Sequence, residues 1–336
     1  MNKLYRSPAL KVLILCCLLL PLAGCDKDGP WLWILHPNGP LARSSVFYLV
    51  VDVLLLGLII LPATVLLIWV YFRFRRGGSG RYDPTFNHSW TIEGIVWGFP
   101  LVLVGVMSYF SYQGMRAVGP YNPQAVQAEV AQQKNPPPPL KVDVISTDWQ
   151  WLFIYPKLHI AVANRLIVPT HRKVELRLTA VGATNDFYIL KVVNQIYAMP
   201  GMRTKHNFLL DRTGTYRGYS TEFSGPGFAW MNYDLKVVKP GAFQDWVTKA
   251  QSSSHQMDMA QFKQFAQPTV NTGNTWTVYG SVAPHLFNDV IADVKSGQLT
   301  GSWPMRLTED MTSKEFARQH GTGPKSSQPF DGTNAN

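Results

Sequence analysis

Two long apolar runs in the first third of the chain constrain its fold more than any other feature. Val46 to Phe72 and Ile92 to Tyr112 are apolar almost throughout, and a helix needs ~20 residues to cross a hydrocarbon core of ~30 Å. We therefore predict a two-helix transmembrane hairpin over residues 46–115, with a connecting loop at residues 73–91. After residue 115 the sequence has the mixed composition of a soluble domain.

Charge sets the expected orientation of this hairpin. Four arginines stand among the nine residues 73–81, directly after the first apolar run. Such a cluster marks the cytoplasmic side of a membrane protein. The N-terminus and all residues after 115 are then expected on the outer side, so both chain termini are periplasmic in a bacterium. The sequence predicts a two-pass protein of the bacterial inner membrane.

The first 24 residues have the features of a secretory signal. Lys3, Arg6 and Lys11 precede the apolar stretch Val12 to Leu20, which is too short to span a bilayer. Leu22-Ala23-Gly24-Cys25 then resembles the lipobox of bacterial lipoproteins. This resemblance implies cleavage before Cys25 and a lipid attached to its sulfur. An ordinary signal peptide followed by an incidental cysteine is the alternative. Residues 25–45 form a short periplasmic lead.

Cysteine content and charge exclude several classes of protein. The three cysteines are Cys16, Cys17 and Cys25, so we expect no disulfide framework and no thiolate metal cluster after residue 25. The formal net charge is +10, but outside the loop at residues 73–91 there is no dense basic run with interleaved aromatic residues. We therefore expect no nucleic-acid partner.

The outer part begins with a linker and continues with strands. Residues 116–139 are rich in Gln, Ala and Pro and end in Pro136 to Pro139, which favours a stiff extended spacer. Residues 140–240 contain segments with alternating polar and apolar residues, separated by Gly and Pro turn signals. This spacing predicts an antiparallel β-sandwich or barrel. The clearest of these segments are 141–145, 173–178 and 233–238.

The segment after the strands is expected to be helical. Apolar residues recur at three- and four-residue spacing over residues 243–265, and the methionines there are expected in the core rather than at a copper site. We place a helical C-terminal extension at residues 241–300. The polar residues 301–336 are expected to be disordered.

The loop at residues 216–231 carries a family resemblance. Gly218, Glu222, Gly225 and Met231 stand at the spacing of the dinuclear copper loop in subunit II of the haem–copper respiratory oxidases. The resemblance implies a cupredoxin-like fold for residues 140–240. The ligand residues of that loop are absent here. Four other side chains stand at the ligand positions: Asn185, Ser220, Ser224 and Phe228.

Loss of the ligands is typical of one branch, subunit II of quinol oxidases of the cytochrome bo type, which the chain resembles from about residue 25 to about residue 295. The segment from Tyr279 to Ile291 is similar to the C-terminal extension of that branch. The resemblance implies a non-catalytic subunit of a proton-translocating ubiquinol oxidase, with no cofactor, metal or catalytic residue of its own. Subunit I is expected to hold the haems, a single copper and the quinol, and subunits III and IV and membrane lipid are further expected partners.

The same resemblance gives Glu93 a role. His88-Ser89, Glu93, Trp97 and Pro100 follow the pattern at the start of the family's second transmembrane helix. Glu93 then matches the carboxylate that feeds protons toward subunit I. The alternative is an acid that only stabilises a helix N-terminus.

Asp52, inside the first apolar run, is equally compatible with a functional role and with solvation near the membrane surface.

Trp149 matches a tryptophan that is proposed to receive electrons in the copper-bearing relatives. Without copper behind it, we expect Trp149 to pack against the membrane-embedded partner subunit.

Two other functions are weighed against a quinol oxidase subunit. One is a cytochrome c oxidase subunit that accepts electrons at the loop, and the missing ligands argue against it. The other is a free-standing membrane lipoprotein, such as a copper chaperone or assembly factor, which has no need for Glu93 or two spans.

Overall fold

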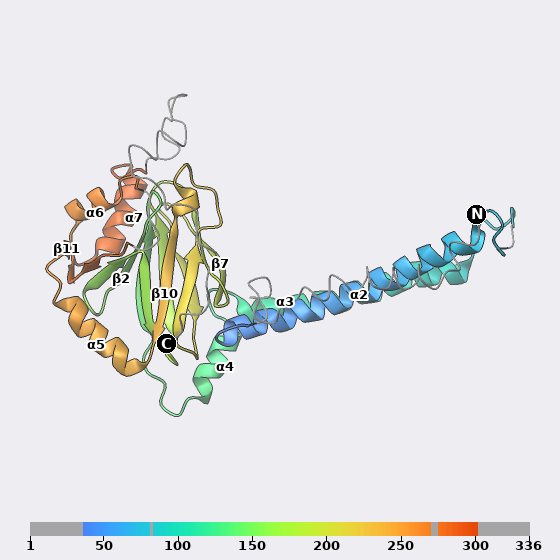
Figure 1. The fold of residues 1–336 in the computed structure, drawn as a ribbon, viewed down its shortest axis with the longest axis horizontal. Helices are drawn as coiled ribbons and strands as arrows, with labels where there is room; N and C mark the ends of the chain where they lie inside the picture. The colour runs from blue at the N-terminus through green and yellow to red at the C-terminus, as the bar shows by residue number, and fades with distance from the viewer. Residues whose placement is uncertain (1–35, 81–82, 270–274, 302–336) are drawn as a thin grey trace, which may run out of the picture.

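The computed structural model of the protein describes residues 36–80, 83–269 and 275–301. A long helical hairpin projects from one side of a β-domain, and helices of the C-terminal part cover the other side (Figure 1). The predicted signal at residues 1–24, the lipid attachment at Cys25 and the polar tail at residues 302–336 lie outside the described residues.

The two predicted apolar helices are present and are longer than the apolar runs. Helix α2 covers Pro40–Phe74 and helix α3 covers Trp90–Val118. Both are long and apolar enough to cross a membrane. The additional turns lie at the end of the hairpin that meets the β-domain (Figure 1). Apolar periodicity could not indicate these turns, because they lie outside the apolar runs.

The start of α2 is fixed to the β-domain by one buried side chain, Asn38, which is 1% exposed. Its Nδ2 donates to the Tyr216 hydroxyl at 2.6 Å and to the Arg212 carbonyl at 3.0 Å. Its Oδ1 accepts the backbone N–H groups of Asp211 and Arg212 at 3.3 and 3.2 Å. Gly39 follows at φ 90°, where a Cβ atom would lie 2.1 Å from the Leu209 carbonyl oxygen. The hairpin is therefore tied directly to the domain.

The predicted extended linker contains a helix. Helix α4 covers Gln124–Gln132, and the extended backbone is confined to the residues that follow it before the first strand. Its residues are good helix formers. The helix is held by tertiary contacts, because Val126 is fully buried and Glu129 pairs with Arg43 of α2 at 3.1 Å. The expectation of a stiff spacer throughout residues 116–139 is wrong for this segment.

The β-domain consists of two sheets packed face to face. One has six strands in the order β12-β3-β2-β1-β5-β8 and the other has five in the order β4-β10-β9-β6-β7. Most neighbours are antiparallel, but β1 pairs with β5 and β10 pairs with β4 in parallel. The predicted β-sandwich is confirmed, but the prediction that its strands are antiparallel is wrong for these two pairs, because alternation shows which face is buried and not the direction of the neighbouring strand. The bounds are β1 Leu140–Ser146, β2 Trp151–Tyr155, β3 Ile160–Ala163, β4 Arg165–Pro169, β5 Val174–Ala180, β6 Asn185–Ile189, β7 Val193–Ala198, β8 Thr204–Phe208, β9 Gly214–Tyr219, β10 Asn232–Val238 and β12 Val278–Tyr279.

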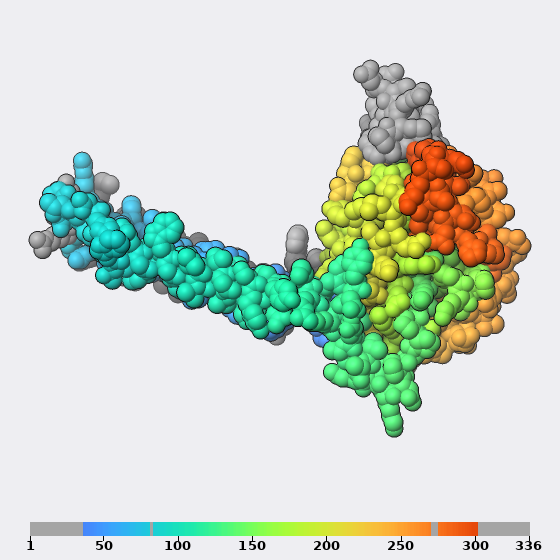
Figure 2. Space-filling model, turned by 180° about the vertical axis from the view of Figure 1, so that it is seen from behind, coloured from blue at the N-terminus to red at the C-terminus, as the bar shows by residue number. Residues whose placement is uncertain are grey.

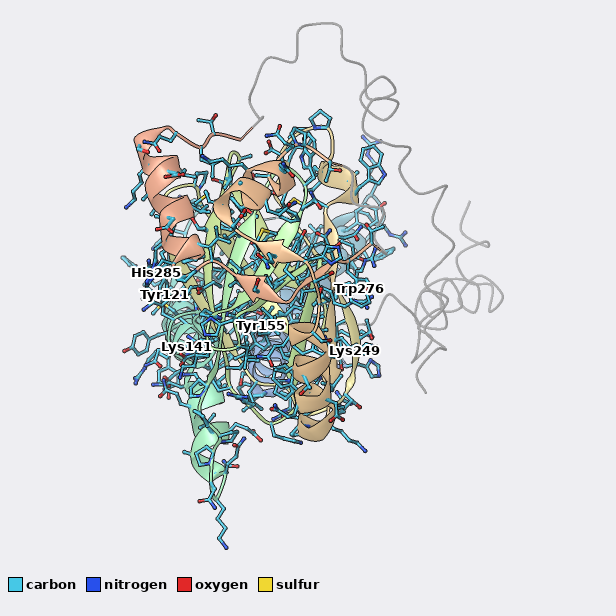
Figure 3. The ribbon with its side chains drawn as sticks, turned by 90° about the vertical axis from the view of Figure 1, so that its left-hand side faces the viewer. Tyr121, Lys141, Tyr155, Lys249, Trp276 and His285 are labelled. Atoms are coloured by element: carbon cyan, nitrogen blue, oxygen red, sulfur yellow. The ribbon has the colours of Figure 1, made fainter. Side chains whose placement is uncertain are left out.

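Aromatic side chains fill the space between the sheets. The rings of Phe187 and Tyr233 stack with centroids 5.1 Å apart, and Trp151 lies 5.2 Å from Tyr233. Tyr155 lies inside the domain (Figure 3), where its hydroxyl bonds both the N–H and the carbonyl of Ile167 at 2.8 Å. Burial of such rings contributes much of the stability of a small domain.

The C-terminal segments from residue 257 on form a second apolar cluster on the outside of the first sheet, whereas the helix before them packs on the main core. The predicted helical segment 243–265 consists of two helices, α5 Pro240–Gln251 and α6 Met259–Phe265, separated by a loop and the short strand β11 Gln256–Met257. Strand β13 Ser281–Val282 pairs with β11, and helix α7 covers Leu286–Ser296. Met257 is fully buried, as expected for a core methionine. Figure 2 shows these orange and red segments against the side of the domain.

Candidate functional site

The copper-type loop connects β9 to β10 and lies beside the first residue of β6. Residues 220–231 form a tight turn that includes the short 3₁₀ helix η3, Phe228–Trp230. Gly218 lies in β9, just before this turn, and a Cβ atom on it would lie 2.2 Å from the ring of Tyr233. Met231 closes the loop and is 2% exposed. Close packing and backbone hydrogen bonds, such as those from Phe228 N–H to the Gly225 carbonyl and from Met231 N–H to the Phe228 carbonyl, hold the loop without a metal.

Two of the four ligand positions meet in a buried hydrogen-bond network. The Ser220 hydroxyl donates to Asn185 Oδ1 at 3.2 Å, and Asn185 Nδ2 lies 3.3 Å from the Ser146 hydroxyl. All three side chains are buried, with exposures of 6%, 1% and 0%. The serine and the asparagine therefore bind each other where the resembled family has a thiolate and an imidazole.

The other two positions do not join this network. Ser224 is 2% exposed, and its hydroxyl has no hydrogen-bond partner in the described part of the chain. The half-buried ring of Phe228 packs 5.8 Å from Phe223, whose side chain is 66% exposed. A phenylalanine offers no donor atom to a metal.

The side chains present do not fit a copper pair. Dinuclear copper needs soft thiolate sulfur and neutral imidazole nitrogen. The positions here offer two hydroxyls, an amide and a hydrocarbon ring. Among the described residues, there is also no group of three or more His, Cys, Asp or Glu side chains able to hold a metal ion. The electron-accepting function of the family loop has no chemical basis in these residues.

Trp149 packs inside this chain rather than on a partner. It is 3% exposed and has a left-handed backbone with φ 72°. Its indole Nε1 donates to the Ser224 carbonyl at 3.0 Å. A Cβ atom on Gly227 would lie 2.2 Å from the Trp149 ring, so the loop closes directly over the indole. The expectation that Trp149 contacts the partner subunit is wrong, because its own loop already covers it.

A buried carboxyl beside the loop is not apparent from the sequence. Asp186 is 2% exposed and bonds the Thr221 hydroxyl. Burial raises the pKa of Asp186; the Thr221 hydrogen bond lowers it in part, and the nearby Glu222 carboxylate raises it further. The signal in the sequence is an acidic residue directly before the aromatic and apolar run Phe187-Tyr188-Ile189.

Glu93 lies in the first turn of α3, at the opposite end of the molecule. Its backbone N–H bonds the Ser89 carbonyl at 3.0 Å, and its Oε1 lies 2.7 Å from His88 Nδ1. The side chains of His88 and Glu93 are 42% and 48% exposed. The ring of His88 also meets the Trp90 ring edge-on at 4.8 Å. The histidine was part of the sequence pattern, but its contact with Glu93 was not predicted.

Asp52 lies on α2, about six turns before the end of that helix at Phe74, and is partly exposed. Its side chain makes no hydrogen bond or ion pair with the described residues. Tyr48 lies one turn before Asp52 on the same face of α2, and its ring packs on Gly114 of α3. The structure brings Asp52 near neither the loop nor Glu93.

Comparison with known proteins gives a family for the β-domain. The sequence profile described as "Cytochrome C oxidase subunit II, periplasmic domain" matches residues 153–238. These residues run from β2 to the end of β10, so the match includes the copper-type loop and all four ligand positions.

Three curated relatives match most of the chain. The "Cytochrome bo(3) ubiquinol oxidase subunit 2" of Buchnera aphidicola subsp. Baizongia pistaciae (strain Bp) is 36% identical over 86% of this chain and 96% of the relative. The "Ubiquinol oxidase subunit 2" of Acetobacter aceti is 31% identical over 83% and 87%. The "Cytochrome bo(3) ubiquinol oxidase subunit 2" of Pseudomonas putida is 30% identical over 94% of both chains.

Proposed function

This chain belongs to the family of subunit 2 of the cytochrome bo(3)-type ubiquinol oxidases, and on that premise we propose that its β-domain is a copper-free structural part of the oxidase. It is a component of a quinol oxidase complex. The observation that carries the proposal is the hydrogen bond between Ser220 and Asn185 at two ligand positions. A site filled by its own side chains in this way supports the neighbouring loop and transfers no electrons.

The electrons are then handled entirely by partner subunits. The quinol, the haems and a single copper belong to subunit I in this proposal, and subunits III and IV complete the assembly. A quinol dissolved in the membrane reaches a membrane-embedded subunit directly. A copper relay on the outer side is therefore unnecessary, which accounts for a loop whose fold persists without its ligands.

Proton uptake is the second part of the proposal, and it assigns Glu93 and His88 to the cytoplasmic mouth of the oxidase. A carboxylate at the end of a membrane helix exchanges protons with bulk water and passes them to a hydrated path in the protein. The 2.7 Å contact between His88 Nδ1 and Glu93 Oε1 allows one proton to be shared between the two groups. Their exposure in the isolated chain leaves them accessible to water and to subunit I.

The third part concerns the membrane. Both termini are placed in the periplasm of the bacterial inner membrane, with Cys25 as the lipid-bearing mature N-terminus. Four arginines at residues 73–81 support this orientation. Intact-protein mass spectrometry tests the anchor: the mature chain should begin at Cys25 and carry acyl mass, and Cys25→Ser should remove that mass. An unmodified N-terminus at another residue would contradict it.

Co-purification tests the proposal as a whole. The tagged chain should bring down a haem-bearing complex that oxidises quinol, and the copper content of that complex should not depend on Ser220 or Ser224. The alternative of a free-standing copper chaperone or assembly lipoprotein is not favoured by the relatives, which are all oxidase subunits. Purification of the chain alone, with bound copper, would instead favour the copper chaperone or assembly lipoprotein.

A further inference from the structure

A pocket of about 230 Å³ lies where α2 meets the β-domain. One wall is the first turns of the helix, and the other is the turn between β6 and β7. The residues used below are Ala42, Val46 and Leu49 on the helix and Tyr188, Lys191 and Asn194 at the turn. The Ser45 hydroxyl lies 3.2 Å from Asn194 Oδ1, so the two walls are joined at one side.

The depth of this pocket in the membrane follows from the length of α2. The first arginine of the cytoplasmic cluster is Arg73, and about 20 residues of helix cross the hydrocarbon core. Counting back from Phe72 places the outer edge of the core near Val53. At ~1.5 Å per residue, Leu49 lies about 6 Å and Val46 about 10 Å beyond that edge. The pocket therefore lies in the layer of lipid headgroups.

An apolar track leads from the pocket into the membrane. The α2 side chains between the pocket and the hydrocarbon core are largely uncovered, with Val50 45%, Val53 58% and Leu54 68% exposed. Leu49 of the pocket wall is itself 39% exposed. A molecule bound in the pocket can thus continue along α2 with a hydrocarbon chain and keep that chain in contact with apolar groups.

Lys191 supplies a cation at this level. It has a left-handed backbone with φ 66°, a conformation that residues with a side chain rarely adopt. Its carbonyl accepts the Asn38 N–H at 2.8 Å, which fixes the turn. Lys191 forms no ion pair in the described part of the chain. Arg43, one turn into α2, is by contrast neutralised by Asp211 and Glu129.

We propose that this pocket binds the headgroup of an anionic phospholipid of the outer leaflet, with its phosphate at Lys191 Nζ and an acyl chain along Val46 and Leu49. The charge, the depth and the apolar track all match an amphipathic anion. The bound lipid would bridge the membrane helix and the β6–β7 turn.

The test uses the intact oxidase complex reconstituted in vesicles of phosphatidylcholine and phosphatidylglycerol, then counts retained lipids by native mass spectrometry. Lys191→Gly removes the cation at a backbone conformation that glycine adopts freely, so the fold should be kept. Lys191→Glu reverses the charge. Lys249→Glu is the matched control, because Lys249 lies on α5 (Figure 3), on the other side of the domain from the hairpin.

Retained phosphatidylglycerol should fall about fivefold in Lys191→Gly and further in Lys191→Glu, as expected for loss of one cation at a membrane surface. Phosphatidylcholine should be unaffected in both variants, and Lys249→Glu should match the wild type. Unchanged phosphatidylglycerol in Lys191→Gly would overturn the proposal. Loss of the haem-bearing subunit from the Lys191 variants, with lipid unchanged, would also overturn it and make the pocket a protein-docking surface.

Discussion

The copper-type loop and the cytoplasmic end of α3 both resemble functional sites, yet they differ in how their polar groups are used. At the loop, Asn185 and Ser220 are nearly inaccessible and bind each other. At the helix end, the side chains of His88 and Glu93 are almost half exposed, and they contact each other through His88 Nδ1 and Glu93 Oε1. A closed polar network holds structure together, whereas an exposed titratable pair is free to exchange protons. Family resemblance therefore locates both regions, but the burial of their side chains distinguishes a structural network from a group that can exchange protons.

The largest expected effect is on copper binding at the copper-type loop. The full-length chain in detergent, mixed with copper salts, should show no near-infrared band of a mixed-valence copper pair, because none of the four positions supplies a suitable ligand. A variant with Asn185→His, Ser220→Cys, Ser224→Cys and Phe228→His should acquire such a band, since the loop backbone is already formed. A band in the wild-type chain would show that the loop is still a metal site.

The second largest expected difference is in the free energy of unfolding, which substitutions at the copper-type loop should lower more than a substitution at Glu93. Trp149→Ala removes a buried indole under the loop and should lower the free energy of unfolding by about 3–5 kcal/mol. Trp149→Phe keeps most of the packing but loses the hydrogen bond to Ser224, at a cost of about 1–2 kcal/mol. Glu93→Ala, at an exposed helix end, should change stability by less than about 0.5 kcal/mol. Denaturant unfolding of the detergent-solubilised chain measures all three. Equal effects of Trp149→Ala and Glu93→Ala would contradict the assignment of the loop as scaffold.

The pH dependence of stability tests the buried carboxyl beside the loop. Because burial raises the pKa of Asp186 above its ordinary value of 3.8, the folded chain binds this proton more tightly than the unfolded chain. Its contribution to stability is therefore full below about pH 4 and is lost as the pH rises through the folded-state pKa. Asp186→Asn should remove this loss, so the free energy of unfolding of the variant should rise relative to that of the wild type as the pH increases from 4 to neutrality.

Asp234→Asn is the matched control for this measurement. Its carboxylate pairs with Arg165 at 3.2 Å and with Arg217 at 3.0 Å, so the same substitution should destabilise the chain by about 1–2 kcal/mol at neutral pH. If both variants were destabilised alike, Asp186 would be an ordinary paired carboxylate.

Sequence patterns predicted which segments form strands and helices better than they predicted which of these pack side by side. Alternation at Val174, Leu176 and Leu178 indicated β5, but nothing in a strand's own residues shows that β5 lies parallel to β1. The helix α4 was missed for a related reason. Its Gln- and Ala-rich sequence between prolines is typical of a linker, and it is the burial of Val126 against the domain that fixes the helix.

The candidate site was predictable only in part. The resemblance to the oxidase family located the four ligand positions and Glu93. It could not show the contact between Glu93 and His88, because residues five apart do not face each other on a regular helix. The contact forms because His88 lies outside the helix, before the extended N-cap residue Ser89. Likewise, Trp149 had no sequence feature that distinguished packing under its own loop from packing on another subunit.

The rate of proton uptake on reduction of the haem–copper centre, measured in the intact complex, tests the central distinction between scaffold and active group most directly. Glu93→Gln keeps the shape of the side chain without its titration and should slow uptake about tenfold, and Glu93→Asp should retain part of the rate. Ser220→Ala with Ser224→Ala alters the copper-type loop and should leave uptake at the wild-type rate. A wild-type rate in Glu93→Gln, together with slow uptake in the double serine variant, would contradict the account.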